Sequence, residues 1–327
     1  MVSVRAERLL DEPIITKATH PSIGANIQGP SLIRVPDWLE ERLGHYYLYF
    51  ADHKGSYIRL AFADDLLGPW TVYPPGSLKL EQSKFPTTPL KSTPAKVEDA
   101  RTRARSTGLN LEGLGHHLIK EWTWPHIASP DVHVDHGNER IVMYFHGLEY
   151  FGKQLTRVAT SLDGINFNAR PEILGGNYWR AFTRNRYTYA LAMPGQFYRS
   201  RDPLSGFEEG PLLFNPDMRH AALLKDNDTL NVFWTQVGHT PERILLSTID
   251  ISGDWKSWKE KDATEILRPE TDWEGADEPL EPSVRSVAYG HVNQLRDPAI
   301  YVQDDDIYLL YAVAGESGIA IAKLHFD

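Results

Sequence analysis

The stretch GPSLIRVPDWLEERLGHYYLYFADHKGSYIRLAFADDLLGPW, residues 29–70, carries the pattern that decides the fold. It contains three short segments rich in apolar, β-branched and aromatic residues: SLIRV (31–35), HYYLYFA (45–51) and YIRLAFA (57–63). Segments of this composition, bounded by turns such as DHKG at 52–55, are typical of β-strands. The stretch therefore predicts a unit of three strands joined by turns and closed by the Gly-Pro-Trp at 68–70.

The same order of strands returns four more times along the chain. The later copies begin at SPDVHVD (129–135), WRAFTRN (179–185), MRHAALLKD (218–226) and LRDPAIYVQDDD (295–306). Repeated short strands without helical periodicity predict an all-β fold with radially arranged sheets, here a five-bladed β-propeller. A β-sandwich with irregular connections is the alternative. Because the fifth copy lacks a fourth strand, the N-terminal segment Val2–Ile15 is expected to supply it and close the ring.

One piece of the chain falls outside the repeat. We expect a single domain over residues 1–327 with an insertion at about 74–124, which contains proline clusters and the helix-compatible stretch KVEDARTRARS (96–106). Long segments of this kind in compact domains are often functional. The insertion is therefore expected to act as a lid or an oligomer contact, although the sequence predicts no particular oligomeric state.

Composition and charge exclude several classes of site and partner. Cysteine is absent, so disulfides and thiolate metal sites are excluded. The formal net charge is -10 and the only basic cluster is RTRAR at 101–105, so no nucleic-acid partner is expected. The N-terminal MVSVRAERLLDEPII lacks the apolar run of a secretory signal, and no segment is long and apolar enough to span a bilayer. A cytoplasmic location without membrane contact is therefore expected.

Propeller geometry predicts where polar side chains gather. The beginnings of the innermost strands and the turns between second and third strands meet at one mouth of the central channel, where converging polar groups indicate a binding site. The strand beginnings place there Asn26, Gln28, Asp131, Trp179, Arg180, Arg219, His220, Arg296 and Asp297, and the turns place there Asp52, His53, Lys54, His146, Glu149, Gln236, His239 and Glu316.

Two stretches resemble a known family of enzymes. YYLYFADHKGSYIRLAFADDLLGPW (46–70) and RDPAIYVQDDDIYLLYA (296–312) are similar to blade patterns of glycoside hydrolase family 43 and of the related families 32, 117 and 130. This resemblance implies a five-bladed propeller that cleaves glycosidic bonds through three carboxylates. The chain departs from the family where an Asp-Pro pair usually begins the first blade, because it reads Gln28-Gly29-Pro30 there and carries Asp297-Pro298 in the last blade.

The carboxylates at the predicted mouth are the candidates for catalysis. Asp131 and Asp297 are expected to line one shared cavity and to be needed for turnover. The general acid is one of Glu149, Glu281 and Glu316, of which we favour Glu316 for its place at the rim. The resemblance implies an inverting reaction.

Ten residues are expected to contact substrate. They are Gln28, His53, His146, Glu149, Trp179, Arg180, Arg219, His220, His239 and Arg296. The three arginines would suit an acidic sugar, since guanidinium groups bind carboxylate, sulfate and phosphate in bidentate pairs. They would alternatively pair with neighbouring acids and order the channel.

The predicted function is that of a glycoside hydrolase acting on a carbohydrate substrate. No cofactor is expected and no metal ligands are assigned, although a divalent metal at the axis, bound by histidines, remains open. A non-catalytic carbohydrate-binding propeller is one alternative, favoured by the missing first-blade aspartate. A glycoside phosphorylase, with phosphate in place of water, is the other.

Overall fold

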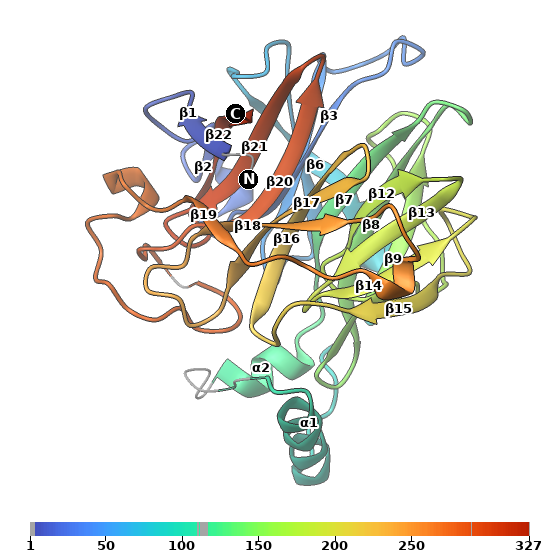
Figure 1. Cartoon of the computed structure of the whole chain (residues 1–327), viewed down its shortest axis with the longest axis vertical. Helices are drawn as coiled ribbons and strands as arrows, with labels where there is room; N and C mark the ends of the chain where they lie inside the picture. The colour runs from blue at the N-terminus through green and yellow to red at the C-terminus, as the bar shows by residue number, and fades with distance from the viewer. Residues whose placement is uncertain (1–3, 110, 112–116, 289, 327) are drawn as a thin grey trace.

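The chain folds into sheets arranged around a common axis, with two helices projecting beyond one end (Figure 1). The computed structural model describes residues 4–109, 111, 117–288 and 290–326. Five antiparallel sheets follow one another in chain order, each beginning with its innermost strand. The prediction of an all-β, five-bladed propeller is therefore confirmed.

Each blade is built from one copy of the repeat. The first contains β3 (Gln28–Arg34), β4 (Tyr46–Ala51), β5 (Tyr57–Ala63) and β6 (Thr71–Lys79). The second contains β7 (Ile127–Asp135), β8 (Arg140–Tyr150), β9 (Lys153–Ser161), β10 (Asn168–Ala169) and β11 (Gly175–Gly176). The third contains β12 (Arg180–Arg184), β13 (Tyr187–Ala192), β14 (Gln196–Ser200) and β15 (Glu208–Leu212). The fourth contains β16 (Met218–Asp226), β17 (Thr229–Gln236), β18 (Ile244–Asp250) and β19 (Thr264–Leu267).

The fifth blade joins the two ends of the chain. It contains β20 (Arg296–Gln303), β21 (Asp306–Val313) and β22 (Gly318–Phe326), and its outer edge is completed by β1 (Val4–Arg8) and β2 (Ile15–Thr16). β1 pairs antiparallel with β22, from Val4 opposite Phe326 to Arg8 opposite Ala322. The expected closure of the ring by the N-terminal segment is confirmed, and β22 is no longer an unpaired edge.

Apolar and aromatic side chains fill the spaces between neighbouring blades. Trp179 illustrates this use of the aromatic residues, because its indole stacks between Tyr144 of the second blade and Tyr198 of the third, with ring centroids 6.1 and 4.9 Å away. Only 1% of its surface is exposed. Trp179 therefore belongs to the core, where stacked aromatic pairs add to the stability gained from burial, and the prediction that it binds substrate is wrong.

The insertion starts later than expected. Because β6 continues to Lys79 as the outer strand of the first blade, the insertion covers residues 80–126 and not 74–124. It contains the short 3-10 helix Leu80–Gln82 and the helices α1 (Pro94–Ser106) and α2 (Leu118–Thr123). Further 3-10 turns lie at Pro21–Ile23, Trp255–Ser257 and Asp272–Glu274. No helix among the described residues is long and apolar enough to cross a membrane.

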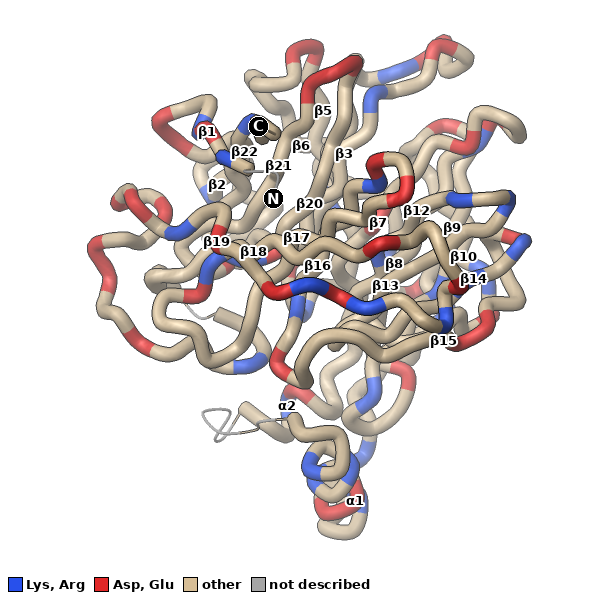
Figure 2. The backbone as a smooth tube through the Cα atoms, viewed as in Figure 1, with Lys and Arg blue, Asp and Glu red and all other residues tan. Residues whose placement is uncertain are grey.

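The residues of the insertion explain why α1 begins at Pro94 and how α1 is held against the second blade. The hydroxyl of Thr93 accepts a hydrogen bond from the amide of Lys96 at 3.3 Å, and Pro94 occupies the first helical position. Acidic and basic residues both occur along α1 (Figure 2), and Arg103 of the RTRAR cluster pairs with Asp99. A small apolar cluster formed by Ala100, Leu118, Trp122 and Phe151 fixes α1 and α2 to the turn between β8 and β9.

Candidate active site

A ring of five unusual backbone positions surrounds the axis at one mouth. One residue at the beginning of each blade has a positive φ: Gly29 (63°), Ser129 (49°), Tyr178 (58°), His220 (50°) and Asp297 (51°). In four blades the pairing register between the first two strands shifts at this same point, which marks a β-bulge. Bulges re-aim side chains, and non-glycine residues with positive φ are uncommon and concentrate at functional sites. The ring therefore marks the candidate active site.

Gly29 explains why the first blade begins with Gly-Pro and not with the Asp-Pro pair that is usual in family 43. A Cβ atom on Gly29 would lie 3.0 Å from the Cα atom of Ser129, closer than such contacts normally are. A side chain at Gly29 would therefore crowd the backbone of Ser129 and would be strained by the positive φ of this position. Asp297 occupies the corresponding position in the fifth blade, and it is the one acidic residue among the five positions of the ring.

Asp297 is a buried carboxyl group with an incomplete set of partners. The hydroxyl of Tyr178 donates a hydrogen bond to its Oδ1 atom, and Nδ1 of His220 lies 3.7 Å from the same oxygen. No described residue forms a hydrogen bond with its buried Oδ2 atom. Burial, followed by repulsion from Glu316, raises the pKa of Asp297 to about 7.

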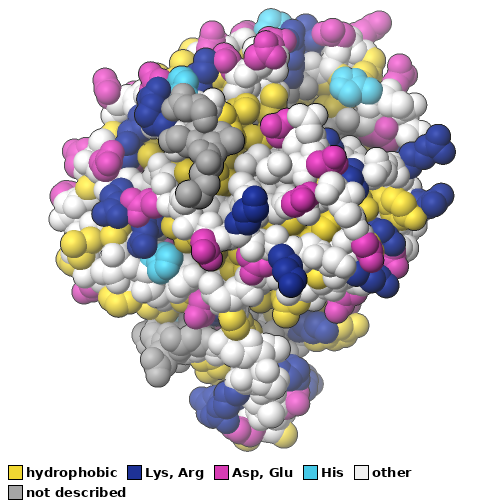
Figure 3. Space-filling model, viewed as in Figure 1, with side chains coloured by type: hydrophobic (Ala, Val, Ile, Leu, Met, Phe, Trp, Pro, Cys, Tyr) yellow, Lys and Arg dark blue, Asp and Glu magenta, His cyan; other side chains and the backbone are white. Residues whose placement is uncertain are grey.

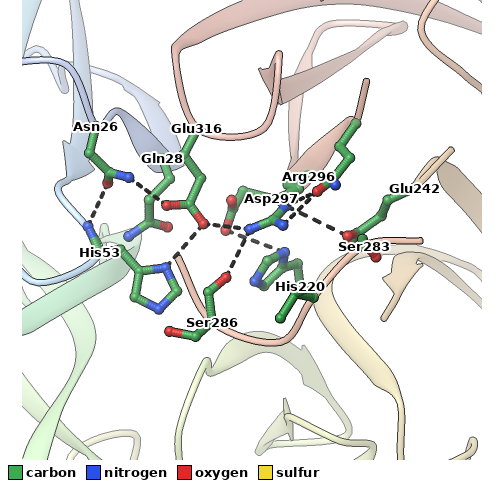
Figure 4. Close-up of polar contacts among 12 residues, drawn as sticks. Asn26, Gln28, His53, His220, Glu242, Ser283, Ser286, Arg296, Asp297 and Glu316 are labelled. Carbon is green, nitrogen blue, oxygen red and sulfur yellow. Dashed lines mark hydrogen bonds and ion pairs between the residues drawn. The ribbon is translucent and has the colours of Figure 1, made fainter. Parts of the chain in front are cut away.

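The surrounding charges explain why Asp297 lacks a counter-ion. Arg219 donates two hydrogen bonds to the buried Glu242, one of them of 2.8 Å. Arg296 donates to Glu316 at 2.9 Å and also lies 3.6 Å from Glu242 (Figure 4). The charges of these two guanidinium groups are thus balanced by two glutamates. Asp297 is a third carboxyl group without a cation of its own, so burial favours its protonated, neutral form.

Glu316 has the opposite environment. Its side chain accepts hydrogen bonds from Asn26 at 2.6 Å and from Arg296, and its Oε1 atom lies 3.1 Å from Nδ1 of His53 (Figure 4). Burial by itself would raise its pKa, but attraction to His53 and Arg296 and these hydrogen bonds lower the pKa of Glu316 to about 2. The favoured assignment of Glu316 as the acid therefore does not fit the structure, which keeps this carboxylate ionised.

A cavity of about 480 Å³, called here the mouth cavity, opens above this cluster. Its polar lining includes Gln28, His53, Ser129, His146, Tyr178, Arg219, His220 and Ser286. Burial, together with nearby cationic groups, lowers the pKa of both His146 and His220 well below the ordinary value, so these rings are neutral. Neutral imidazoles both donate and accept hydrogen bonds, which suits sugar hydroxyls. Among the described residues, no three histidine or acidic side chains are grouped as metal ligands.

Arg180 closes the channel beneath the ring. Its guanidinium donates to the carbonyl oxygens of Pro130 (2.6 Å), Ala221 (3.0 Å) and Pro30 (3.3 Å), which belong to three other blades. Arg180 lines a second cavity of about 450 Å³ on the opposite side, which we call the far cavity. The expectation that Arg180 binds substrate at the mouth is therefore wrong, and its side chain is an axial plug.

Asp131 also lies on the far side of this plug. It lines the far cavity, accepts hydrogen bonds of 2.8 Å from His133 and from the amide of Ala181, and lies 3.6 Å from Arg180. These partners lower the pKa of Asp131 in spite of its burial. The expectation that Asp131 and Asp297 share one cavity is wrong, because Asp297 does not line the far cavity. Asp297 and Glu316 are also absent from the lining of the mouth cavity and lie directly behind it, where Tyr178, His220 and His53, their partners, form the lining.

The other predicted residues divide between the mouth and its supports. His53, His146, His220, Gln28 and Arg219 line the mouth cavity as expected, whereas Arg296 lines a neighbouring cavity behind Ser286. The alternative that the arginines pair with acids describes Arg219 and Arg296 correctly.

Two predicted contacts lie away from the mouth cavity. Glu149 forms an ion pair with Arg157 at 2.8 Å, and neither Glu149 nor His239 lines the mouth cavity. Tyr178 and Glu242 were not predicted at all. The sequence signal for Tyr178 is its position at the beginning of a blade. Tyr178 lies just before β12, and Ser129 and Asp297 lie at the corresponding places in the second and fifth blades.

Comparison with known proteins agrees with the propeller fold. No family model matches the chain. A thermostable family-43 glycoside hydrolase has a TM-score of 0.52 at 12% identity, covering 93% of this chain and 89% of that chain. An α-L-arabinanase of Cellvibrio cellulosa has a TM-score of 0.52 at 12% identity over 92% of this chain and 93% of that one. An endo-1,4-β-xylanase from Bacteroides thetaiotaomicron has a TM-score of 0.55 at 12% identity over 93% and 94%.

These structures share the fold of the chain, and the predicted likeness to the family 43 propeller is confirmed. In sequence, the chain is 37% identical over 325 residues to a protein of Acanthamoeba polyphaga mimivirus named "Uncharacterized protein R118". The match covers 91% of this chain and 83% of the viral protein. The chain therefore belongs to the same protein family as this mimivirus protein, with the five-bladed propeller architecture of the family 43 glycoside hydrolases.

Proposed function

We propose that this protein cleaves glycosidic bonds in the mouth cavity, with Asp297 as the proton donor and Glu316 as the ionised carboxylate. The observation that carries the proposal is a pair of buried carboxyl groups in opposite environments: Glu316 contacts Asn26, His53 and Arg296, whereas Oδ2 of Asp297 has no hydrogen-bond partner among the described residues. These environments lower the pKa of Glu316 to about 2 and raise that of Asp297 to about 7. Environments that separate two carboxyl pKa values in this way are the usual arrangement for an acid and a charged partner in glycoside cleavage.

The chemistry follows from these protonation states. At neutral and mildly acidic pH, Asp297 holds a proton for the departing glycosidic oxygen, and His220, which lines the cavity 3.7 Å from Asp297, offers the proton a short path. As the glycosidic C–O bond breaks, a water molecule forms the new bond to the anomeric carbon and gives its proton to the ionised Glu316. The transition state carries positive charge on the sugar ring. The charge of Glu316 stabilises that state more than the neutral substrate, which is the condition for acceleration. The neutral ring of His146 would hold sugar hydroxyls.

A non-catalytic carbohydrate-binding propeller is the second candidate. The observation in its favour is that Asp297 and Glu316 each expose only 1% of their surface, and that Gly29 stands where the first blade would carry a carboxylate. A phosphorylase receives less support, because the arginines at the mouth are already paired with glutamates.

A product assay separates these functions. The protein is incubated with aryl glycosides and oligosaccharides of arabinose, xylose and galactose, with and without inorganic phosphate, and released sugars are quantified by chromatography. Free sugar released without phosphate supports hydrolysis, and a sugar phosphate formed only with phosphate indicates phosphorolysis. Binding of a glycoside by calorimetry with no product from any substrate would contradict the proposed hydrolase and favour the binding protein.

A further inference from the structure

The mouth cavity has a polar floor and an apolar collar, and the second feature is not needed for cleaving a bond between two sugars. The collar is formed by Leu109, Leu111 and Trp122 of the insertion and by Leu155, Met193 and Pro194 at the rims of the second and third blades. Five of the six are partly exposed, and Trp122 is 8% exposed. Apolar side chains thus face the same hollow from both sides.

The residues of the collar come from segments that are distant in the sequence. The insertion brings three of them over the mouth, where Leu111 packs against the cluster that anchors α1 and α2. The other three lie at the beginning of β9 and in the turn between β13 and β14. Figure 3 shows charged side chains of both signs spread over the outer face of the molecule, whereas the residues of the collar carry no charge.

The basic residues near the collar are mostly neutralised by ion pairs, so the collar stays predominantly apolar. Arg103 and Arg285 also line the cavity, but Arg103 pairs with Asp99 and Arg285 with Asp217 at 2.8 Å. Lys153 is exposed at the rim. Polar side chains also lie beside the collar, where Gln154 and Asn177 line the cavity and contact each other at 3.5 Å, but most of the polar lining lies on the floor, around His53, Tyr178 and His220.

We infer that the substrate is a glycoside with an apolar aglycone, such as an alkyl chain, whose sugar lies on the floor and whose aglycone lies in the collar. This inference rests on the proposed function for the cleavage step, but not for binding. A second sugar in the collar would lose water from several hydroxyls and find few partners there, chiefly Gln154 and Asn177, which is unfavourable. An alkyl group gains from the same burial, and a mostly apolar cavity with few orienting polar groups is the usual form of a small-molecule site.

The test compares methyl and hexyl glycosides of arabinofuranose, xylose, galactose and glucose. Affinity is measured by isothermal titration calorimetry, and release of the free sugar is measured in parallel. Each fully buried methylene is worth about fourfold in affinity. We expect at least about tenfold tighter binding of the hexyl glycoside, which requires burial of about two of the added methylenes.

Variants from the two walls of the collar locate the effect. Leu111→Asn and Met193→Gln are each expected to reduce the hexyl-to-methyl ratio by at least about threefold, since either one replaces part of the apolar wall with a polar group. Leu162→Asn is the matched control, because Leu162 is 76% exposed and does not line the cavity. This control is expected to keep the wild-type ratio. Melting temperatures verify that all three variants fold.

The possible outcomes separate this inference from the proposed function. Tighter binding of hexyl glycosides without release of sugar would support the apolar collar and contradict the hydrolase. Equal affinities for methyl and hexyl glycosides, or no binding of any glycoside in the panel, would overturn the inference. So would a hexyl preference that both collar variants retain.

Discussion

Replacing Asp297 by asparagine is expected to stabilise the folded protein at alkaline pH while it removes the proposed proton donor. In the folded protein Asp297 keeps its proton up to about pH 7, whereas the unfolded chain loses it near the ordinary pKa of 3.8. The wild-type protein therefore loses stability as the pH rises between these two values. Asparagine has a similar shape and does not ionise, so the variant lacks this loss.

The size of the effect follows from the pKa. Each pKa unit corresponds to about 1.4 kcal/mol, so burying the ionised carboxylate disfavours folding by an amount on the order of 4 kcal/mol in total. About 3 kcal/mol of this falls between pH 5 and pH 9. The free energy of unfolding of Asp297→Asn, relative to wild type, should therefore increase by about that amount between pH 5 and pH 8 and stay constant above pH 8.

Urea denaturation of both proteins at several pH values from 5 to 9 measures this difference. Asp163→Asn is the matched control, because hydrogen bonds from Ser161 and Asn166 outweigh burial and lower the pKa of Asp163. Asp163 is ionised throughout the range, so its variant should be destabilised by a constant amount. A constant difference between Asp297→Asn and wild type from pH 5 to pH 9 would refute the account of a buried carboxyl group without a counter-ion.

Three further predictions address the axis, the pH profile and the ring closure. Arg180→Met should lower the free energy of unfolding by about 3 kcal/mol or more in urea denaturation, because three buried carbonyl oxygens lose their donor; an unchanged value would contradict the plug. On the best glycoside, kcat/KM should fall as the pH rises above about 7, where Asp297 loses its proton; a rate that rises across this range would remove Asp297 as the acid. Deleting residues 1–8 exposes the edge of β22 and should cause concentration-dependent self-association in sedimentation velocity; a deletion variant that stays monomeric with an unchanged melting temperature would argue against closure by β1.

The architecture could be predicted because every blade repeats the same local chemistry. Aromatic and β-branched strands bounded by acidic, asparagine or glycine turns recur at Gly29–Trp70 and in four later copies, and the structure places one blade at each. The strand β6 was partly missed because its sequence, TVYPPGSLK, contains two prolines and a glycine and so looks like a loop. As the outer strand of its blade it tolerates prolines that an inner strand would exclude.

The chemistry of the mouth was harder to predict because it depends on register. Asp131 follows the ring residue Ser129 by two positions, which moves it roughly 6.6 Å further along the strand and past the plug formed by Arg180. Ser129-Pro130 and Asp297-Pro298 are the corresponding pairs, and this correspondence was visible in the sequence. The pKa values of Asp297 and Glu316 depend on burial, on each other's charge and on contacts with His53 and Arg296, which come from other blades or from a distant part of the same blade. No local pattern reveals which acid each arginine contacts.

The central claim is that the carboxyl groups at the mouth, and not the one at the far cavity, perform the reaction. The most direct measurement compares Asp297→Asn, Glu316→Gln and Asp131→Asn with the wild-type protein on the best glycoside substrate, at pH 6 and at matched folded concentration. The account predicts that kcat falls by about 10²–10⁴ in the first two variants and stays within about threefold of wild type in Asp131→Asn. Full activity in Asp297→Asn together with loss of activity in Asp131→Asn would contradict it.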